Sequence, residues 1–111
     1  NPCPTQKDLE KGFENLKKVI LKKGKKRRYD GDDYPTTSYT FNDMVFSYRS
    51  IAPNSKYPQE IIHVTGSGSY WIIKSEGTYA INNKAFPAKI AKQKRKAALD
   101  HFCNHLLNFK E

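Results

Sequence analysis

Apolar residues recur at helical spacing near the start of the chain. Thr5 followed three residues later by Asp8 has the form of a capping box, which satisfies the first backbone groups of a helix. Gly24 is a stop signal. The pattern therefore predicts a surface helix from about Gln6 to Lys23 with one apolar stripe. The stripe consists of Leu9, Phe13, Leu16, Val19 and Ile20.

The stretch 57–83 has a different pattern, with three short segments rich in Ile, Val, Tyr and Trp separated by glycine-containing breaks. Such residues suit a pleated, half-buried surface, so the stretch predicts a three-stranded antiparallel meander. Alternation in residues 60–65 places Glu60 on one face and His63 on the other. Neither face is wholly apolar, so the pattern leaves open which face is buried.

The segments on either side of the meander are less regular. Residues 36–48 alternate as a strand, and Asn42 with Asp43 forms either a bulge in one bent strand or the turn of a hairpin. Residues 84–91 fit a last strand with Pro87 at an edge or bulge. Residues 92–107 fit a helix. The predicted class is α+β, with the N-terminal helix packed on a central antiparallel sheet and an additional C-terminal helix as one alternative.

Composition adds limits to this picture. The 111 residues predict a single domain spanning 1–111, with 37% hydrophobic residues and a net charge of +9. No apolar run is long enough to cross a membrane. The chain begins at Asn1 rather than Met, and we expect a mature form from which a leader has been removed. The two cysteines, Cys3 and Cys103, predict a disulfide in a secreted domain; two free thiols in a cytosolic protein are the alternative.

Two basic stretches, residues 17–28 and 89–96, hold 13 of the 20 Lys and Arg residues, eight in the first and five in the second. A solvated charged loop is the simpler interpretation of the first stretch. The functional alternative is a phosphate-binding arm, because exposed basic segments attract nucleic acid. The candidate nucleic-acid-binding residues are Lys22, Lys23, Lys25, Lys26, Arg27, Arg28, Lys89, Lys92, Lys94, Arg95 and Lys96.

Other candidate sites are weaker. His101 and His105 have the spacing of metal ligands, but no third ligand accompanies them, so a surface pair is favoured. The Gly-Ser run 66–69 joins two predicted strands, which favours a hairpin turn over a phosphate loop. No metal or cofactor is expected. Several aromatic residues would offer stacking surfaces for bases if exposed, although core packing or a cross-strand pair is favoured for Trp71. They are Tyr34, Tyr57, Tyr70, Trp71 and Tyr79.

The order of these elements resembles the small fungal guanine-specific ribonucleases, and still more the RNase-like secreted effectors of powdery mildew fungi, the RALPH effectors. The resemblance covers most of the chain through short motifs whose order and spacing carry it. These motifs are Tyr34 with Pro35, Tyr57 with Pro58, Ile61 with Ile62, residues 79–83, residues 84–90, and Phe102 with Cys103.

The resemblance implies positions for the catalytic groups of a ribonuclease. The family's first His follows the Tyr-Pro pair, where this chain has Thr36, and its Glu precedes the aromatic-Pro pair, where this chain has Lys56. Its Arg corresponds to Thr78, and its last His corresponds to Lys92. A lysine accepts a proton at neutral pH only after a large fall in its pKa. The resemblance therefore predicts a microbial ribonuclease-like fold without ribonuclease activity.

The expected function is binding by a secreted fungal effector inside plant host cells. The resemblance implies that it suppresses defence and is recognised as an avirulence factor by a plant immune receptor of the NLR class. Another host protein, RNA or the ribosome are the other expected partners, with no membrane association and a monomeric state. The alternatives are an active secreted ribonuclease or ribotoxin with a rearranged site, and a generic basic nucleic-acid-binding secreted protein. Glu60 and His63 would not form a rearranged catalytic pair, because three residues apart in a strand they point to opposite faces.

Overall fold

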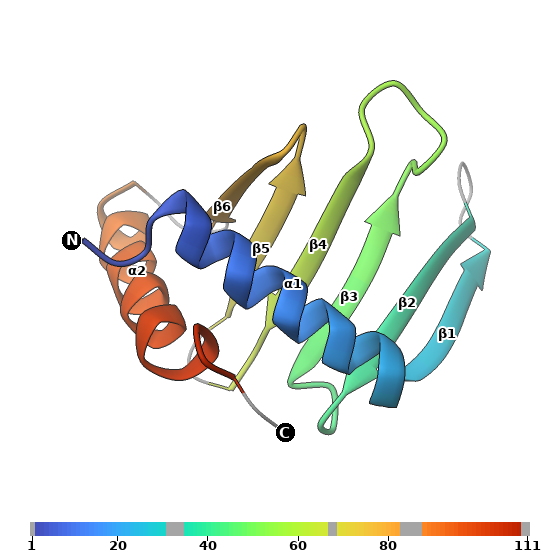
Figure 1. The fold of residues 1–111 in the computed structure, drawn as a ribbon, viewed down its shortest axis with the longest axis horizontal. Helices are drawn as coiled ribbons and strands as arrows, with labels where there is room; N and C mark the ends of the chain where they lie inside the picture. Colours follow the sequence, from blue (N-terminus) through green and yellow to red (C-terminus); the bar gives the residue numbers. More distant parts are fainter. Residues whose placement is uncertain (1, 31–34, 67–68, 83–87, 110–111) are drawn as a thin grey trace.

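A computed structural model describes residues 2–30, 35–66, 69–82 and 88–109 (Figure 1). One helix precedes six strands, and a second helix follows them. The elements are α1 (Gln6–Lys23), β1 (Lys25–Asp30), β2 (Pro35–Phe41), β3 (Phe46–Ile51), β4 (Gln59–Val64), β5 (Tyr70–Ser75), β6 (Thr78–Asn82), α2 (Ala88–His101) and the π-helical turn η1 (Phe102–Leu106).

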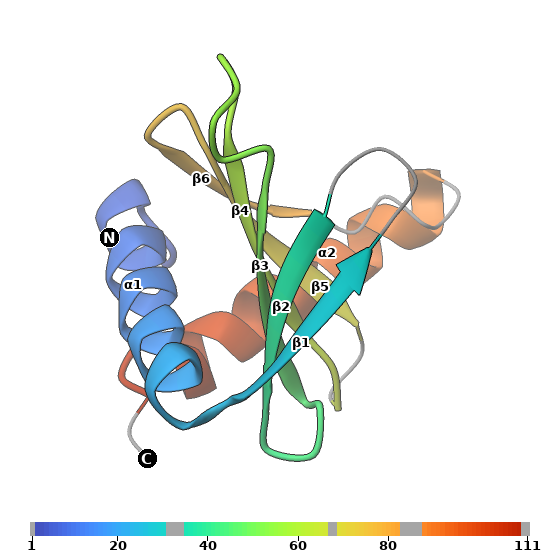
Figure 2. The same ribbon diagram turned by 90° about the vertical axis from the view of Figure 1, so that its right-hand side faces the viewer.

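The six strands form one antiparallel sheet in which spatial order equals sequence order, from β1 at one edge to β6 at the other. The predicted meander is confirmed as β4, β5 and β6. Figure 2 shows α1 on one side of the twisted sheet, with the C-terminal end of the chain on that same side. We call the face toward α1 the covered face and the opposite face the open face. The α+β class with a helix on an antiparallel sheet, and with a C-terminal helix, is confirmed.

The first helix has the predicted bounds. Thr5 Oγ1 accepts a hydrogen bond from Asp8 N at 3.2 Å, and Asp8 Oδ2 accepts one from Thr5 N at 3.0 Å, which completes the capping box. Gly24 ends the helix in an extended conformation rather than a left-handed one. Glycine is needed there because a Cβ would lie 2.4 Å from the Ile20 carbonyl oxygen and 2.8 Å from that of Thr40.

The core lies between α1, the C-terminal helical segment and the covered face. Its strand residues are those that alternate toward α1, which resolves the open question about β4: Ile62 and Val64 are buried in the core. Ile61 is also buried, although it belongs to the open face. The core residues are Leu9, Phe13, Leu16, Ile20, Phe46, Tyr48, Ile62, Val64, Tyr70, Ile72, Tyr79, Ile81, Ala98, Phe102 and Leu106.

The C-terminal segment is helical. The predicted helix over residues 92–107 is confirmed, but α2 begins earlier, at Ala88, so residues 88–91 are helix and not the end of a last strand. The rest of that predicted strand, residues 84–87, lies outside the described residues. The helix widens at η1, where Leu107 N donates to the Phe102 carbonyl oxygen at 2.9 Å. Gly12 of α1 admits the Phe102 ring, because a Cβ at Gly12 would lie 2.3 Å from Phe102 Cζ.

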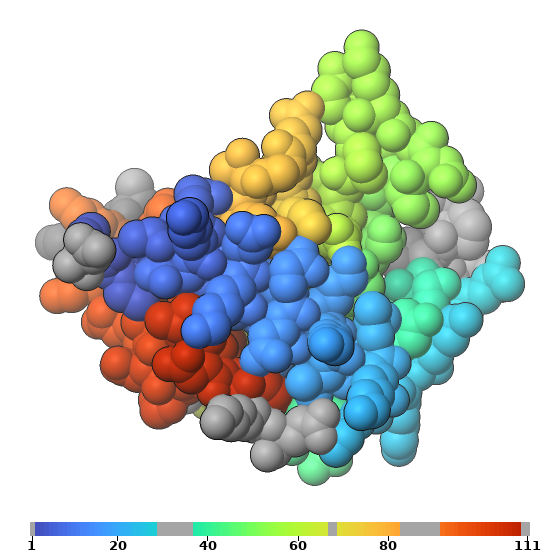
Figure 3. All heavy atoms as spheres, viewed as in Figure 1, coloured from blue at the N-terminus to red at the C-terminus, as the bar shows by residue number. Residues whose placement is uncertain are grey.

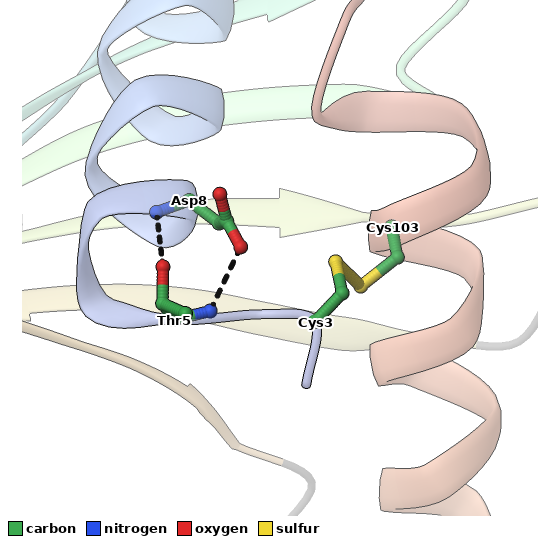
Figure 4. Close-up of a disulfide and its surroundings, with 4 residues drawn as sticks. All are labelled: Cys3, Thr5, Asp8 and Cys103. Carbon is green, nitrogen blue, oxygen red and sulfur yellow. Dashed lines mark hydrogen bonds between the residues drawn. A yellow bond between two sulfur atoms is a disulfide. The ribbon is translucent and has the colours of Figure 1, made fainter. Parts of the chain in front are cut away.

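The predicted disulfide is confirmed. Cys3 and Cys103 are bonded with their Cα atoms 6.2 Å apart, and the capping box of α1 lies beside the bond (Figure 4). The bond closes a loop of 100 residues, a constraint worth up to ~4.7 kcal/mol in the chain-entropy account. It fixes the start of α1 to the end of the C-terminal helix.

Lys22 and Lys23 fall within the predicted helix Gln6–Lys23, but the interpretation of the rest of the basic stretch 22–28 as a solvated loop is wrong. Lys22 and Lys23 complete α1, while residues 25–28 pair with β2 as the edge strand β1. Lysine and arginine are tolerated on an edge strand, because their side chains reach water on both faces. Asn42 and Asp43 lie in the turn of a hairpin between β2 and β3, one of the two predicted alternatives. None of the described helices is long and apolar enough to span a membrane.

Candidate nucleic-acid interface

Two rows of side chains cross the open face at right angles to the strands. The strand register fixes both rows, since each residue is paired with the next across neighbouring strands. The first row is Lys25, Thr40, Ser47, His63, Trp71 and Asn82. The second row is Arg27, Ser38, Arg49, Ile61, Ile73 and Ala80. Cations therefore lie at the β1–β3 end of the rows, and the aromatic pair lies at β4 and β5.

The middle of the first row is hollow because its residues are small. Thr40 and Ser47 stand between the long side chain of Lys25 and the rings of His63 and Trp71. The result is a concavity of about 440 Å³, which we call the central concavity. Its lining consists of Ser38, Thr40, Met44, Ser47, Arg49, Ile61, His63 and Trp71.

His63 and Trp71 form a stacked pair at one side of the central concavity. Their ring centroids are 4.7 Å apart and their planes differ by 6°. The cross-strand alternative predicted for Trp71 is thus confirmed, and the indole is partly exposed rather than part of the core. His63 Nε2 lies 2.5 Å from Ser69 Oγ. Burial and the nearby charge of Arg49 lower the pKa of His63 below its usual 6.5, which favours a neutral ring at neutral pH.

A second hollow of about 530 Å³, the basic concavity, lies beside the β2–β3 turn. Its lining consists of Lys23, Lys25, Arg27, Thr40, Phe41, Asn42, Asp43 and Met44. The two concavities share Thr40 and Met44. They therefore adjoin one another on the open face.

The turn between the concavities has an unusual backbone. Asn42, Asp43 and Met44 have φ values of 56°, 52° and 69°, a left-handed run without glycine. Asn and Asp tolerate this region better than other residues, whereas Met44 is strained there. The Met44 side chain is 56% exposed. Strained, exposed residues of this kind concentrate at functional sites.

The two faces of the sheet differ in the pairing of their charges. None of the described open-face residues in the two rows is acidic. Glu60 points instead to the covered face, where its carboxylate pairs with Lys17, accepts a hydrogen bond from Tyr48 Oη at 2.6 Å, and lies 3.5 Å from Lys74 Nζ. Asp43 in the turn is the one carboxylate that lines either concavity among the described residues.

Glu60 is held in its charged form by this network. Burial by itself would raise the pKa of Glu60, but the hydrogen bonds from Lys17 and Tyr48 and the charges of Lys17 and Lys74 lower it below its usual value. This carboxylate lies on the covered face, whereas the His63 ring lies on the open face. The two side chains point to opposite faces, as the spacing predicted, and they do not share a substrate position.

The structure places the four positions matched to ribonuclease catalytic groups in separate elements. Thr36 is in β2 and Thr78 opens β6, four strand spacings or ~19 Å away. Lys56 lies in the exposed loop between β3 and β4, which stands clear of the body in Figure 3, and Lys92 is in α2. Lys56, Thr78 and Lys92 line neither concavity.

The two basic stretches lie at opposite ends of the sheet. The first continues from α1 into β1 at one edge, and the second is in α2, which packs against β6 at the other edge. Lys92, Lys94, Arg95 and Lys96 are exposed there. Lys25 and Arg27 are the predicted residues that both belong to the open-face rows and line a concavity. Arg49 and His63 were not among the predicted binding residues, because their neighbourhood depends on strand register.

Other predicted candidates are placed as follows. Tyr70 and Tyr79 are buried and Tyr57 is 59% exposed, while Tyr34 lies outside the described residues. His105 is exposed, but His101 is half-buried with Nδ1 2.6 Å from Tyr70 Oη, so only part of the predicted surface pair is at the surface. Nowhere in the described part of the chain do three or more His, Cys, Asp or Glu side chains gather as a metal site.

The chain matches no family model, no curated protein and no solved structure at a significant level.

Proposed function

We propose that this protein binds single-stranded RNA on the open face of its sheet and does not cleave it. The observation that carries the proposal is the His63–Trp71 stack beside Arg49 in a hollow lined by hydroxyl groups. Proteins that bind single strands combine cations along the nucleic-acid backbone with aromatic rings on which bases stack. The two rows supply both groups on one surface, and neither row contains a carboxylate that would repel phosphate.

The position of Glu60 supports a non-catalytic role. Phosphodiester cleavage by general acid–base chemistry needs a base and an acid on either side of the reacting phosphate. The one glutamate in the described strands faces α1 and is bonded to Lys17 and Tyr48. His63 on the open face therefore lacks a carboxylate partner in the rows that surround it.

The resemblance to RNase-like effectors extends the proposal to a biological role. On that basis the protein is a secreted fungal effector that acts inside plant cells, where it binds RNA, the ribosome or a host protein and is recognised by an immune receptor. The disulfide fits the secreted class, because such bonds persist in oxidising compartments. Transient expression of this chain in leaves tests this role: suppression of defence responses is expected, and unchanged responses would oppose it.

The binding proposal can be tested with intrinsic fluorescence, because Trp71 is the single tryptophan. We expect a short single-stranded RNA to quench Trp71, and an RNA duplex of the same sequence to quench it less. Trp71→Ala, followed by anisotropy of labelled RNA, should weaken binding by ~1–3 kcal/mol, the contribution of one stacked base. Arg49→Ala should weaken binding and reduce its salt dependence. Unchanged affinity in both variants would overturn the proposal.

The alternative of an active ribonuclease has its own test. Purified protein incubated with total RNA should leave it intact. If cleavage occurs and is lost separately in Glu60→Gln and His63→Ala, the protein is an enzyme with a rearranged site. Cleavage that survives both changes points to a contaminating nuclease.

A further inference from the structure

We infer that the basic concavity and the central concavity are one groove, across which a single RNA strand runs from Trp71 to β1. In this arrangement a base stacks on the Trp71 end, while phosphates several nucleotides away contact Lys25 and Arg27. The inference rests on the proposed function of the open face. It adds the direction in which the RNA strand crosses the sheet and the minimum length of RNA that spans the groove. It also assigns base stacking to one end of the groove and phosphate binding to the other.

Continuity of the groove follows from shared walls. Thr40 and Met44 line both hollows, and the first row passes without interruption from Lys25 through Thr40 and Ser47 to His63. Thr40 and Ser47 are short, so they form a floor rather than a barrier. Met44 stands at the junction, where its exposed thioether side chain can contact a base or sugar between the two ends.

The strand spacing sets the length of the ligand. Lys25 and Trp71 are four strands apart, which corresponds to ~19 Å across the sheet. A stacked nucleic-acid strand advances about 3.4 Å per nucleotide, so about six stacked nucleotides cover this distance, and fewer do so when unstacked. A dinucleotide bound at Trp71 therefore leaves the β1 cations uncontacted, whereas an octanucleotide reaches both ends.

The two ends differ in chemistry. At β4 and β5 the groove offers stacked rings and the apolar side chain of Ile61. At β1 it offers the exposed cations of Lys25 and Arg27. Ring stacking responds weakly to salt, while phosphate contacts release counterions and weaken as salt rises. Salt dependence should therefore grow when the ligand becomes long enough to reach β1.

A length-matched titration tests the inference. Quenching of Trp71 by oligouridine is measured for a dinucleotide and an octanucleotide, with the wild type and Lys25→Ala/Arg27→Ala. For the octanucleotide we expect a loss on the order of tenfold near 0.1 M salt and a decrease of about 1.4 in the log–log salt slope, from two lost phosphate contacts. For the dinucleotide we expect no change from the double substitution.

The control variant is Lys7→Ala/Lys18→Ala, which removes two charges from exposed positions on α1, on the other side of the sheet. It should leave both affinities near those of the wild type. Lys25→Gln/Arg27→Gln provides a second groove variant if the alanines unfold the edge strand, as judged by thermal melting. An equal loss for both ligand lengths, or an equal loss in the α1 control, would overturn the groove and leave a general charge effect.

The outcomes separate this inference from the proposed function. If neither oligonucleotide quenches Trp71, the open face does not bind RNA and both fail. If both oligonucleotides bind and the β1 substitutions change nothing, RNA binding stands and the continuous groove is wrong.

Discussion

The covered and open faces of the sheet are built from the same strands, but the covered face packs in the core and the open face carries the candidate binding residues. In β4 and β5 the even-numbered positions face α1 and the odd-numbered positions face away. Ile72 is fully buried beneath the helix, while its neighbour Ile73 lies half-buried in the second row. Glu60 is enclosed by a lysine and a tyrosine, while His63 stacks on Trp71. Alternation thus separates structural residues from candidate binding residues within one strand.

The two faces also treat charge differently. On the covered face Lys17 pairs with Glu60, and Lys74 bridges Glu14 and Glu60, so the local charges are largely neutralised. On the open face Lys25, Arg27 and Arg49 lie in rows that contain no acidic residue, and Asp43 in the adjoining turn is the one carboxylate among the described residues that lines either concavity. Cations clustered in this way attract phosphate, and the net charge of +9 adds to the attraction.

The sharpest test of the two-face division compares Ile72→Ala with Ile73→Ala. Removing the fully buried Ile72 side chain leaves a cavity under α1, so we expect the free energy of unfolding to fall by ~2–5 kcal/mol. The same truncation at half-buried Ile73 should cost less than about 1.5 kcal/mol. Urea unfolding monitored by circular dichroism measures both, and similar losses in the two variants would contradict the division.

Local patterns predicted much of the fold. The helix Gln6–Lys23 and the meander follow from apolar periodicity and from caps or turns within a few residues, and both are confirmed. The strand β1 could not be found this way, because its four consecutive cations are acceptable only at a sheet edge. The sequence also did not show which face of β4 is buried. Glu60 lies on the buried face, where Lys17, 43 residues away in the sequence, neutralises its charge.

The candidate site was less predictable than the fold. Lys25 and Arg27 were found from charge alone, whereas Arg49 is a single cation in an ordinary strand pattern. Its place beside His63 and Trp71 depends on the register of three strands, β3, β4 and β5, and on the two turns between them. Register is set by long-range packing and turn geometry, which a single sequence shows only in part.

Acid should lower the free energy of unfolding by protonating the carboxylates of the covered face. The pKa values of Glu14 and Glu60 are below their usual value of 4.5, despite burial that would raise them, because lysines and tyrosines hydrogen-bond the charged forms. A lowered native pKa gives stability that is fully present above the unfolded value and is lost as pH falls through the native value. We expect the contribution of these two carboxylates to the unfolding free energy to be fully present above about pH 4.5 and to be lost as pH falls further.

Glu60→Gln isolates this effect. The amide keeps the shape of the side chain but leaves Lys17 without its partner, so we expect a loss of ~1–3 kcal/mol at pH 7 and a shallower acid limb. Exposed Glu10 on α1 supplies the control, because Glu10→Gln should leave both the stability and its acid limb unchanged. An unaltered acid limb in Glu60→Gln would show that this carboxylate contributes little to the covered face.

Acid should strengthen RNA binding on the open face, although it destabilises the covered face. Burial and Arg49 keep the pKa of His63 below 6.5, and a bound phosphate would favour its protonated form. Affinity for single-stranded RNA should therefore rise as pH falls from 7 toward about 5.5, by up to ~5-fold for one added phosphate contact. His63→Phe retains a ring on Trp71 and removes the titration, so its affinity should not change over this range. Parallel pH profiles for the two proteins would exclude His63 as the titrating group.

The smallest expected effect concerns Asp43, the carboxylate that lines the basic concavity. Its charge opposes phosphate at the junction between the two ends of the groove. Asp43→Asn should raise the affinity for an RNA octanucleotide by about twofold, since exposed charge interactions of this kind are worth less than about 1 kcal/mol. Asparagine tolerates the left-handed backbone at φ 52° as well as aspartate does, so stability should be preserved.

Glu10→Gln again makes the same change in charge on the α1 side of the sheet. A comparable gain in that control would mean that net charge, rather than the position of Asp43 in the groove, governs the affinity. A gain confined to Asp43→Asn, and absent with a dinucleotide bound at Trp71, would place the carboxylate along the path of the longer strand. The affinity for RNA would then depend on the position of each charge along the groove of the open face, and not on charges on the α1 side of the sheet.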